Sequence, residues 1–214
     1  PSKDAQDPEP HKQIQRNAPL TVLTLDRLVS LQDYADFALA FAGIDKAVAT
    51  WTWNGERRGI LLSVAGTDGA AVTFASSEEL GTRLMAVMKR YSPPFTPLMI
   101  RSYQKVLFKI SASLVIDVDY SSEKVLVEVR NRLEEAFSFA NRHLGYSIAM
   151  SEILSVIQSH EAVHAVDVDF LYRASHRPFL NSRLRANSPR IGGRGKILFR
   201  AELLMIDSDG INLR

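Results

Sequence analysis

An unbroken two-residue period over positions 106–118 limits what this chain can fold into. Every even-numbered position in that stretch is apolar, whereas the odd positions are mostly polar. This period predicts a long β-strand with one buried face. After a break at residues 119–122, apolar residues recur at helical spacing: Val125, Val129, Leu133, Phe137 and Ala140. With Ser121 or Ser122 as its cap, the predicted helix and the strand form one side of a two-layer α/β core.

The sequence before this stretch predicts a helix followed by a hairpin. Ser30 and Asp33 have the spacing of a helix cap, and Gly43 ends the predicted helix. Trp51 and Trp53 then alternate with threonines along a strand, and Asn54-Gly55 is the preferred pair for a two-residue type I′ turn. We expect the chain to return as a strand over residues 59–65.

A second helix and a short strand complete the first half. Ser76 and Glu79 predict a capping box, and the apolar stripe between positions 80 and 91 predicts the helix behind it. Ser92-Pro-Pro ends that helix. Residues 98–103 predict a short strand.

The second half predicts a further helix and two strands. Apolar residues at 153–157 indicate a short helix, and residues 163–172 alternate as a strand with Val166, Val168 and Phe170 on one side. Residues 196–205 predict a last strand, and residues 207–210 a turn.

These elements predict an α+β fold of two-layer modules, with mixed or antiparallel strands and helices mainly on one face. We expect a flexible leader or the end of a missing upstream domain over residues 1–18. The first α/β module covers residues 19–104 and the second covers residues 105–173. An extended basic arm with a terminal strand follows over residues 174–214.

Composition excludes several classes of protein. No run of eighteen apolar residues exists, so we expect no membrane span. The chain has no cysteine, which excludes disulfides, thiolate metal ligands and a cysteine nucleophile. The net charge of +2 hides an asymmetry, because residues 171–200 contain eight basic residues and no acidic one. A basic arm on an acidic body indicates a binding partner.

The motif His160-Glu161-Ala162-Val163-His164 matches the HExxH pattern of zinc proteases. In those enzymes the motif lies on one helix, so that both imidazoles face one metal and the glutamate activates a metal-bound water. Here the helical stripe ends at Ile157 and the strand alternation begins at Val163. The motif therefore spans a helix end, a turn and a strand start, and we expect its histidines not to share a face.

Other candidate sites are weaker. The glycine-rich segment 192–196 lacks the spacing of a phosphate loop. The pairs Asp117/Asp119 and Asp167/Asp169 lie at strand ends, where solvated carboxylates are ordinary, and calcium needs six or more oxygen ligands. We therefore expect no catalytic residue, cofactor or metal ligand. The residues expected to mediate interactions are exposed aromatic and basic side chains: Trp51, Trp53, Arg177, Arg183, Arg185, Arg190 and Arg194.

Several collinear stretches resemble the baseplate J-like wedge proteins of phage tails and contractile injection systems. They are residues 25–38, 42–47 and 64–69, Tyr91-Ser-Pro-Pro with residues 97–103, Ile116-Asp-Val-Asp-Tyr, and residues 136–140, 150–158, 165–172 and 201–207. Each stretch is weak alone, but the ordered set is specific. Members of this family are usually longer, so the chain resembles a C-terminal portion. Where the family commonly has a Pro-Gly turn, this chain has Glu161-Ala162.

The resemblance implies a structural protein without catalytic residues. Wedge proteins assemble with copies of themselves and with other wedge subunits into a ring that links sheath and spike. It implies assembly in the bacterial cytoplasm as part of a phage tail or phage-like particle, with the basic arm docked along acidic neighbours. Two alternatives remain open. One is a zinc metallopeptidase using His160, Glu161 and His164. The other is a nucleic-acid-binding module working through the basic arm, although we expect protein partners rather than nucleic acid.

Overall fold

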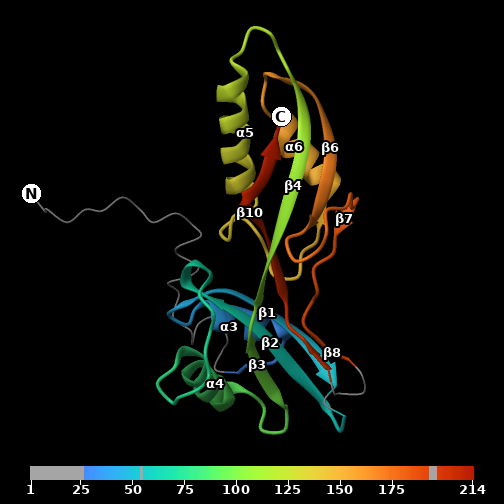
Figure 1. Cartoon of the computed structure of the whole chain (residues 1–214). Coiled ribbons are helices and arrows are strands. Elements are labelled where there is room, and N and C mark those ends of the chain that lie inside the picture. Colours follow the sequence, from blue (N-terminus) through green and yellow to red (C-terminus); the bar gives the residue numbers. More distant parts are fainter. Residues whose placement is uncertain (1–26, 54, 193–196) are drawn as a thin grey trace, which may run out of the picture. The chain divides into compact units, whose positions relative to one another are not determined.

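The computed structural model describes residues 27–53, 55–192 and 197–214, which form an α+β fold as expected (Figure 1). The chain divides into two compact units between Ser102 and Tyr103. The expected leader at residues 1–18 and the strand-like entry that follows it lie outside the described residues. The expected module boundary after residue 104 stays a prediction.

Unit 1 begins with helix α3 (Leu31–Leu39), and its cap is the predicted one. The Ser30 side chain accepts a hydrogen bond from the Asp33 backbone N–H at 3.1 Å, and Asp33 Oδ2 accepts one from the Ser30 N–H at 2.8 Å. These contacts satisfy N–H groups that the first helical turn leaves unpaired. The hydrogen bond from the Ser30 side chain is the main cause of the lowered pKa of Asp33.

The sheet of unit 1 has the order β1-β2-β3, with β1 (Ile44–Trp53) antiparallel and β3 (Leu98–Ser102) parallel to the central β2 (Arg58–Gly66). Trp53 pairs with Arg58, so four residues (54–57) join the two strands. The expected two-residue type I′ turn is therefore wrong, and Asn54 lies outside the described residues. After β2, the short 3₁₀ helix η1 (Thr67–Gly69) forms the expected turn.

Helix α4 (Leu80–Tyr91) starts without the expected capping box. Glu79 is its N-cap, with no side-chain cap, and its carboxylate instead accepts a hydrogen bond from the Ala75 N–H at 2.6 Å. The Gly81 N–H donates to the Thr73 carbonyl at 3.1 Å, so the loop backbone satisfies one N–H of the first turn. The core of unit 1 lies between these helices and the sheet: Leu28, Tyr34, Phe37, Ala38, Ile44, Ile60, Leu62, Val64, Val72, Leu84, Met88 and Ile100.

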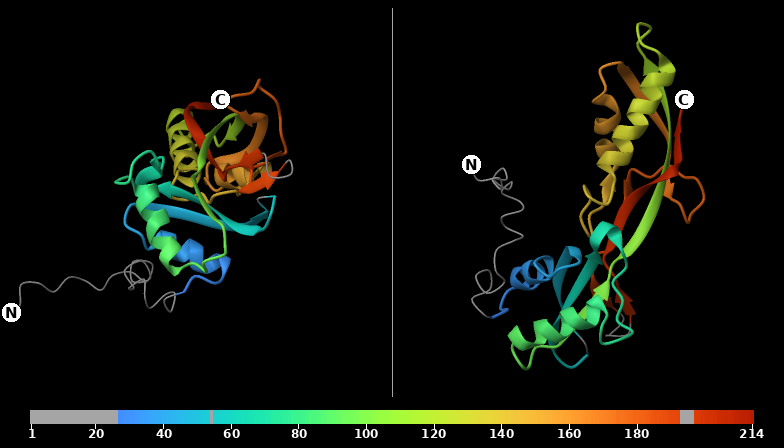
Figure 2. Two further views of the ribbon diagram at one scale, coloured as in Figure 1. Left: turned by 90° about the horizontal axis from the view of Figure 1, so that it is seen from below. Right: turned by 90° about the vertical axis from the view of Figure 1, so that its left-hand side faces the viewer.

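Unit 2 contains the long strand and helix that the periodicity predicts. Strand β4 (Gln104–Ile116) buries its even-numbered residues from Val106 to Ala112, with Phe108 and Ala112 at 0% exposure. Helix α5 (Ser122–Ala136) and helix α6 (Met150–Gln158) lie on one face of the sheet, as the right-hand view of Figure 2 shows. The expected strand runs two residues too far, because the chain turns after Ile116 and leaves Val118 fully outside the core.

Helix α5 starts without a side-chain cap and ends against a packed aromatic pair. Ser121 is the N-cap residue, but its side chain makes no cap hydrogen bond. At the other end, the rings of Phe108 and Phe137 meet edge to face with centroids 5.4 Å apart. Phe137 is the C-cap, so the helix ends before Ala140, which is exposed rather than part of the apolar stripe. Edge-to-face pairs add to the stabilisation from burial.

Strand β6 (Val163–Arg173) is antiparallel to β4, but its inward residues differ from the expected set. Ser111 pairs with Phe170 and Ala112 with Val168, which leaves Asp169 as an extra residue on β6. Such a bulge reverses the alternation along a strand. Val168 and Leu171 therefore face the core, and Phe170 is 43% exposed.

The C-terminal segment completes the sheet of unit 2, whose order is β10-β4-β6. Strand β9 (Ile197–Phe199) pairs with β8 (Arg190–Gly192), and β10 (Glu202–Leu213) runs parallel to β4. The expected turn at residues 207–210 is wrong, because β10 continues through it. These four residues form a bulge opposite Lys109, whose Nζ lies 3.5 Å from an Asp207 carboxylate oxygen.

The described part of the basic segment, residues 174–192, packs against unit 2. Its strand β7 (Arg183–Leu184) pairs with β5 (Ile148–Ala149), and Leu184 is 4% exposed within the core. The Asn181 side-chain amide donates to the Leu171 carbonyl at 2.7 Å, which holds the segment along the edge of β6. This part is therefore anchored to the second module rather than a free arm.

Candidate functional site

The HExxH match does not form a metal site. His160 follows α6 and is 4% exposed, whereas His164 lies in β6 with a side chain that is 63% exposed. His160 Nε2 lies 2.8 Å from Glu128 Oε2, and its Nδ1 accepts a hydrogen bond from the Ala162 N–H at 3.2 Å. Because a backbone N–H can only donate, the proton of the imidazole must be on Nε2. Both ring nitrogens of His160 thus have partners within the fold. The ends of the elements confirm that the motif lies between a helix and a strand, because α6 ends at Gln158 and β6 begins at Val163.

One aspartate of each pair is held by neighbouring groups. Asp117 accepts a hydrogen bond from the Asp119 N–H at 3.1 Å, which is the main cause of its lowered pKa, and it also contacts His164 Nε2 at 3.2 Å. Asp169 binds the Arg214 guanidinium at 3.2 Å. Within the described ranges, no three His, Asp or Glu side chains gather in a way that could hold a metal ion.

The two tryptophans project from the hairpin of unit 1. Trp51 is 39% exposed and Trp53 is 55% exposed. The Arg58 guanidinium lies over the Trp51 ring, 4.1 Å from its centroid, which holds that ring by a cation–π contact. A rigid, exposed aromatic pair is typical of residues that anchor protein interfaces. Their role in such an interface stays a prediction.

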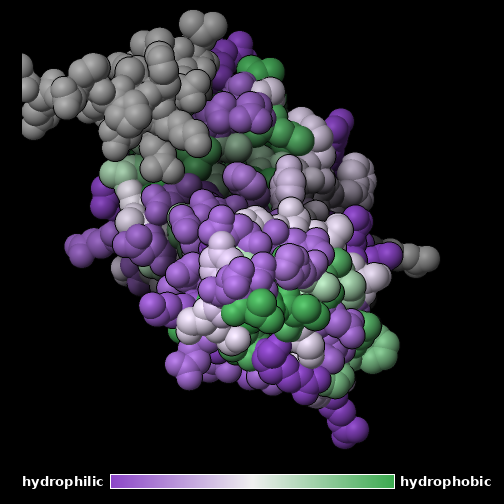
Figure 3. Space-filling view, turned by 90° about the horizontal axis from the view of Figure 1, so that it is seen from above, coloured by the Kyte–Doolittle hydropathy of each residue, from purple (hydrophilic) through white to green (hydrophobic). Residues whose placement is uncertain are grey.

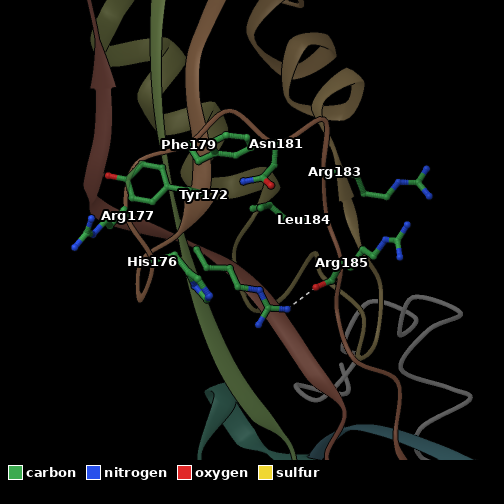
Figure 4. A pocket seen from close by; sticks show the side chains of 9 residues that line it. Tyr172, His176, Arg177, Phe179, Asn181, Arg183, Leu184 and Arg185 are labelled. Carbon is green, nitrogen blue, oxygen red and sulfur yellow. Dashed lines mark hydrogen bonds between the residues drawn. The ribbon is translucent and has the colours of Figure 1, made fainter.

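The basic segment lines an open pocket in unit 2, with a volume of about 790 Å³. Three of the expected interaction residues line it, Arg177, Arg183 and Arg185. Figure 4 shows Arg183 and Arg185 side by side and extending the same way, whereas Arg177 points away from them. This arrangement follows from β7, because Leu184 points inward and leaves its two neighbours on the opposite face.

A buried carboxylate holds the wall of this pocket. Glu202, which is 3% exposed, accepts hydrogen bonds from the Asn187 backbone N–H at 2.8 Å and from its side-chain amide at 3.0 Å. Arg173 binds both Glu202 and the Arg185 carbonyl. Burial raises the pKa of Glu202. The hydrogen bonds from Arg173 and Asn187 lower this pKa by more than burial raises it, so the net pKa shift is downward.

The remaining expected residues lie apart from the pocket. Arg190 is on β8, where its guanidinium stacks 4.5 Å from the Phe199 ring centroid. Arg194 and the rest of the glycine-rich segment lie outside the described residues. Sequence reasoning missed the pocket residues Tyr172, His176 and Phe179. Their only signal in the sequence is that they flank Arg177 in a segment without acidic residues.

Two features of the described residues define the chemistry of this pocket. Its lining has arginines, a histidine and aromatic rings but no carboxylate. None of Arg177, Arg183 and Arg185 has its guanidinium paired in the part of the chain that the structure describes. The pocket can therefore bind carboxylates or other anions.

No helix in the described part of the chain is long and apolar enough to cross a membrane. A comparison with curated proteins finds no match. Residues 26–101 match the family described as the Baseplate J-like central domain. This segment covers nearly the whole described part of unit 1.

Among solved structures, the fold is similar to a chain of the anti-feeding prophage (AFP) baseplate, determined by cryo-EM with six-fold symmetry, at a TM-score of 0.58. The sequence identity is 10%, and the match covers 93% of this chain and 42% of that one. This chain thus spans less than half the length of the baseplate chain that it matches. The family match and the fold agree with the collinear motifs, and residues 26–101 are similar to the Baseplate J-like central domain.

Proposed function

We propose that this chain is a structural subunit of the baseplate of a contractile phage tail or a phage-like injection system. The match of residues 26–101 to the Baseplate J-like central domain carries the proposal. The fold likeness over 93% of the chain to a baseplate component supports it. In the proposed role the chain is a wedge subunit that assembles in the bacterial cytoplasm into a ring between sheath and spike.

The surfaces of both units suit this role. Unit 1 exposes a tryptophan pair that its own core leaves partly uncovered, and unit 2 exposes arginines without partners among the described residues. Large assemblies use such features, because aromatic and arginine side chains dominate the binding energy of protein interfaces. A metal-dependent catalytic role would instead need several convergent ligands, and the described residues form no group of three that could hold a metal ion.

The experiment is a gene deletion in the organism that produces the particle, followed by electron microscopy of the tail fraction. We expect particles with a defective or missing baseplate, restored by the intact gene and less well by Trp51→Ala/Trp53→Ala. Mass spectrometry of purified particles tests whether the chain is a component. Normal particles that lack this chain would contradict the proposed function.

A matched control separates an interface effect from misfolding. Thr50 lies next to Trp51 on the same strand, and its side chain faces the other side of the sheet. We expect Thr50→Ala to restore particles as well as the intact gene does. If both substitutions impair assembly equally, the tryptophans act through stability rather than contact.

A further inference from the structure

We propose that unit 2 binds an acidic segment of a partner protein in its arginine pocket, with one apolar side chain of that segment held between two groups of arginines. The arginine pocket is the open pocket described above, whose lining residues all fall within positions 172–185. The inference deepens the proposed function, on which it rests for its biological setting.

The middle of the arginine pocket is apolar. Figure 4 shows the Tyr172 and Phe179 rings and the Leu184 side chain between Arg177 on one side and Arg183 and Arg185 on the other. Leu184 is 4% exposed and belongs to the core, whereas the Phe179 ring is 65% exposed. An apolar side chain of a ligand can cover this ring and gain the burial that folding leaves unused.

Both sides of this apolar floor carry positive charge that the fold does not use. Among the described residues, the guanidinium groups of Arg177, Arg183 and Arg185 have no partner, and the pocket lining contains no carboxylate. Arg173, the remaining arginine of the lining, is already paired with Glu202. Carboxylates match the planar guanidinium fork. The ligand that fits best therefore has acidic residues on both sides of its apolar residue.

The backbone of the pocket is fixed before a ligand binds. The Leu171 N–H donates to the Phe179 carbonyl at 3.1 Å, and the Asn181 N–H donates to the Leu171 carbonyl at 3.2 Å. These bonds hold the Phe179 backbone along the edge of β6 while its ring stays exposed. On the other wall, Arg173 binds the Arg185 carbonyl. Such a preorganised site loses little conformational entropy on binding.

Val118 is an exposed apolar side chain with the opposite electrostatic surroundings. It lies in the turn between β4 and α5 and is 95% exposed. Figure 3 looks onto the end of unit 2 that carries this turn and shows a hydrophobic patch surrounded by hydrophilic side chains. Asp117 and Asp119 flank Val118, so this turn repels an acidic segment. The arginine pocket instead combines exposed apolar surface with unpaired arginines.

A protein segment fits this arrangement better than nucleic acid does. Single-stranded nucleic acid binds along a basic groove that follows its phosphates, with its bases stacked on aromatic rings. Here the apolar floor separates Arg177 from Arg183 and Arg185, so their charges do not form a continuous track. A peptide can place one side chain on the floor and its carboxylates on both sides.

Fluorescence anisotropy of a labelled peptide mixed with the full chain tests the inference. The probe is a capped nine-residue peptide with two glutamates on each side of a central phenylalanine. Wild type should bind it saturably, and more weakly as salt rises, since exposed charges are screened. Arg183→Glu/Arg185→Glu should weaken binding at least about tenfold. The control Lys89→Glu/Arg90→Glu makes the same change of charge on the exposed end of α4 and should bind like wild type.

A second probe, with glycine in place of the phenylalanine, separates the apolar contact from charge attraction. Wild type should bind the glycine probe about fivefold more weakly. This difference should disappear in Phe179→Ala and persist in Phe170→Ala, which removes an exposed ring of β6 outside the pocket lining. Circular dichroism spectra like that of wild type establish that the variants fold. Absence of binding, or equal binding of both probes by wild type, overturns the inference.

Two further measurements distinguish peptide binding from nucleic-acid binding and from a failure of the proposed function. If a single-stranded DNA oligonucleotide binds through Arg183 and Arg185 and the peptide does not bind, the pocket is a nucleic-acid site and the inference is wrong. If the chain is a component of purified particles but the probe does not bind, the inference fails while the proposed function stands. Probe binding by a chain that is absent from particles would support the inference and contradict the proposed function.

Discussion

Arg173 binds Glu202 through both nitrogens of its guanidinium fork, with Nη1 3.1 Å from Oε1 and Nη2 2.8 Å from Oε2. Arg173 ends β6 and Glu202 begins β10, so this ion pair joins the two outer strands of the sheet across β4. The same guanidinium holds the Arg185 carbonyl. One buried carboxylate therefore fixes both the sheet and the wall of the arginine pocket.

Glu202→Gln should destabilise unit 2 by about 3 kcal/mol at pH 7, because it leaves a partly buried guanidinium without its counter-charge. The folded-state pKa of Glu202 lies below the ordinary value of 4.5, so its contribution is fully present above that value. It is lost as the pH falls through the folded-state pKa. Denaturant unfolding followed by far-UV circular dichroism should show a difference between wild type and variant that shrinks at acidic pH.

The exposed Glu123→Gln substitution is the control for that measurement, and it should change the free energy of unfolding by less than about 0.5 kcal/mol. A Glu202→Gln effect that is equal at pH 7 and at pH 3 would mean that the charge of the carboxylate does not matter.

Helix α5 offers a matched pair of valines for a test of its buried face. Val129 is 0% exposed and packs in the core of unit 2, whereas Val127, half a turn away, is 56% exposed. Val129→Ala should lower the free energy of unfolding by about 2 kcal/mol, through lost burial and the cavity left behind. Val127→Ala should change it by less than about 0.5 kcal/mol in the same denaturant titration. Equal effects would contradict the assigned face.

The sequence predicts those features of the fold that depend on local periodicity and capping. The strand containing Phe108, the helix containing Val129 and the cap at Ser30 all follow from spacing and side-chain chemistry. Residues close in the sequence determine each of these features, and no contact with a distant segment changes it.

Features that depend on pairing with distant segments could not be predicted in this way. The bulge at Asp169 exists because β6 must match β4, and it exchanges the roles of Phe170 and Leu171. The sequence of residues 207–210 is typical of a turn. In the structure, pairing with β4 on both sides of these residues keeps the chain in the strand, and they form a bulge. The pocket likewise depends on the pairing of β7 with β5. This pairing places Leu184 in the core and leaves Arg183 and Arg185 exposed.

The histidines of the HExxH match should respond differently to substitution. His160→Ala should destabilise the protein by about 2 kcal/mol, because it removes a buried ring and leaves the Ala162 N–H unpaired. His164→Ala should change the free energy of unfolding by less than about 0.5 kcal/mol, since that side chain is 63% exposed. Thermal unfolding with and without chelator, together with elemental analysis, provides the measurement. Stoichiometric zinc that both substitutions remove would support a metallopeptidase instead.

Gly81 should be required in α4 for its lack of a side chain, although alanine is the better helix former. A Cβ built on Gly81 would lie 2.4 Å from Phe74 Cε1 and 2.5 Å from the Thr73 carbonyl oxygen. The backbone oxygen cannot move aside without breaking its hydrogen bond from the Gly81 N–H. Gly81→Ala should therefore destabilise unit 1 by about 2 kcal/mol, as overpacked cores do.

Tryptophan fluorescence isolates this effect, because both tryptophans of the chain lie in unit 1. The control is Lys89→Ala on the exposed face of the same helix, which should change the free energy of unfolding by less than about 0.5 kcal/mol. If Gly81→Ala instead raises the midpoint of the fluorescence transition, the loop at Thr73 and Phe74 does not press against the start of α4, and helix propensity decides the outcome.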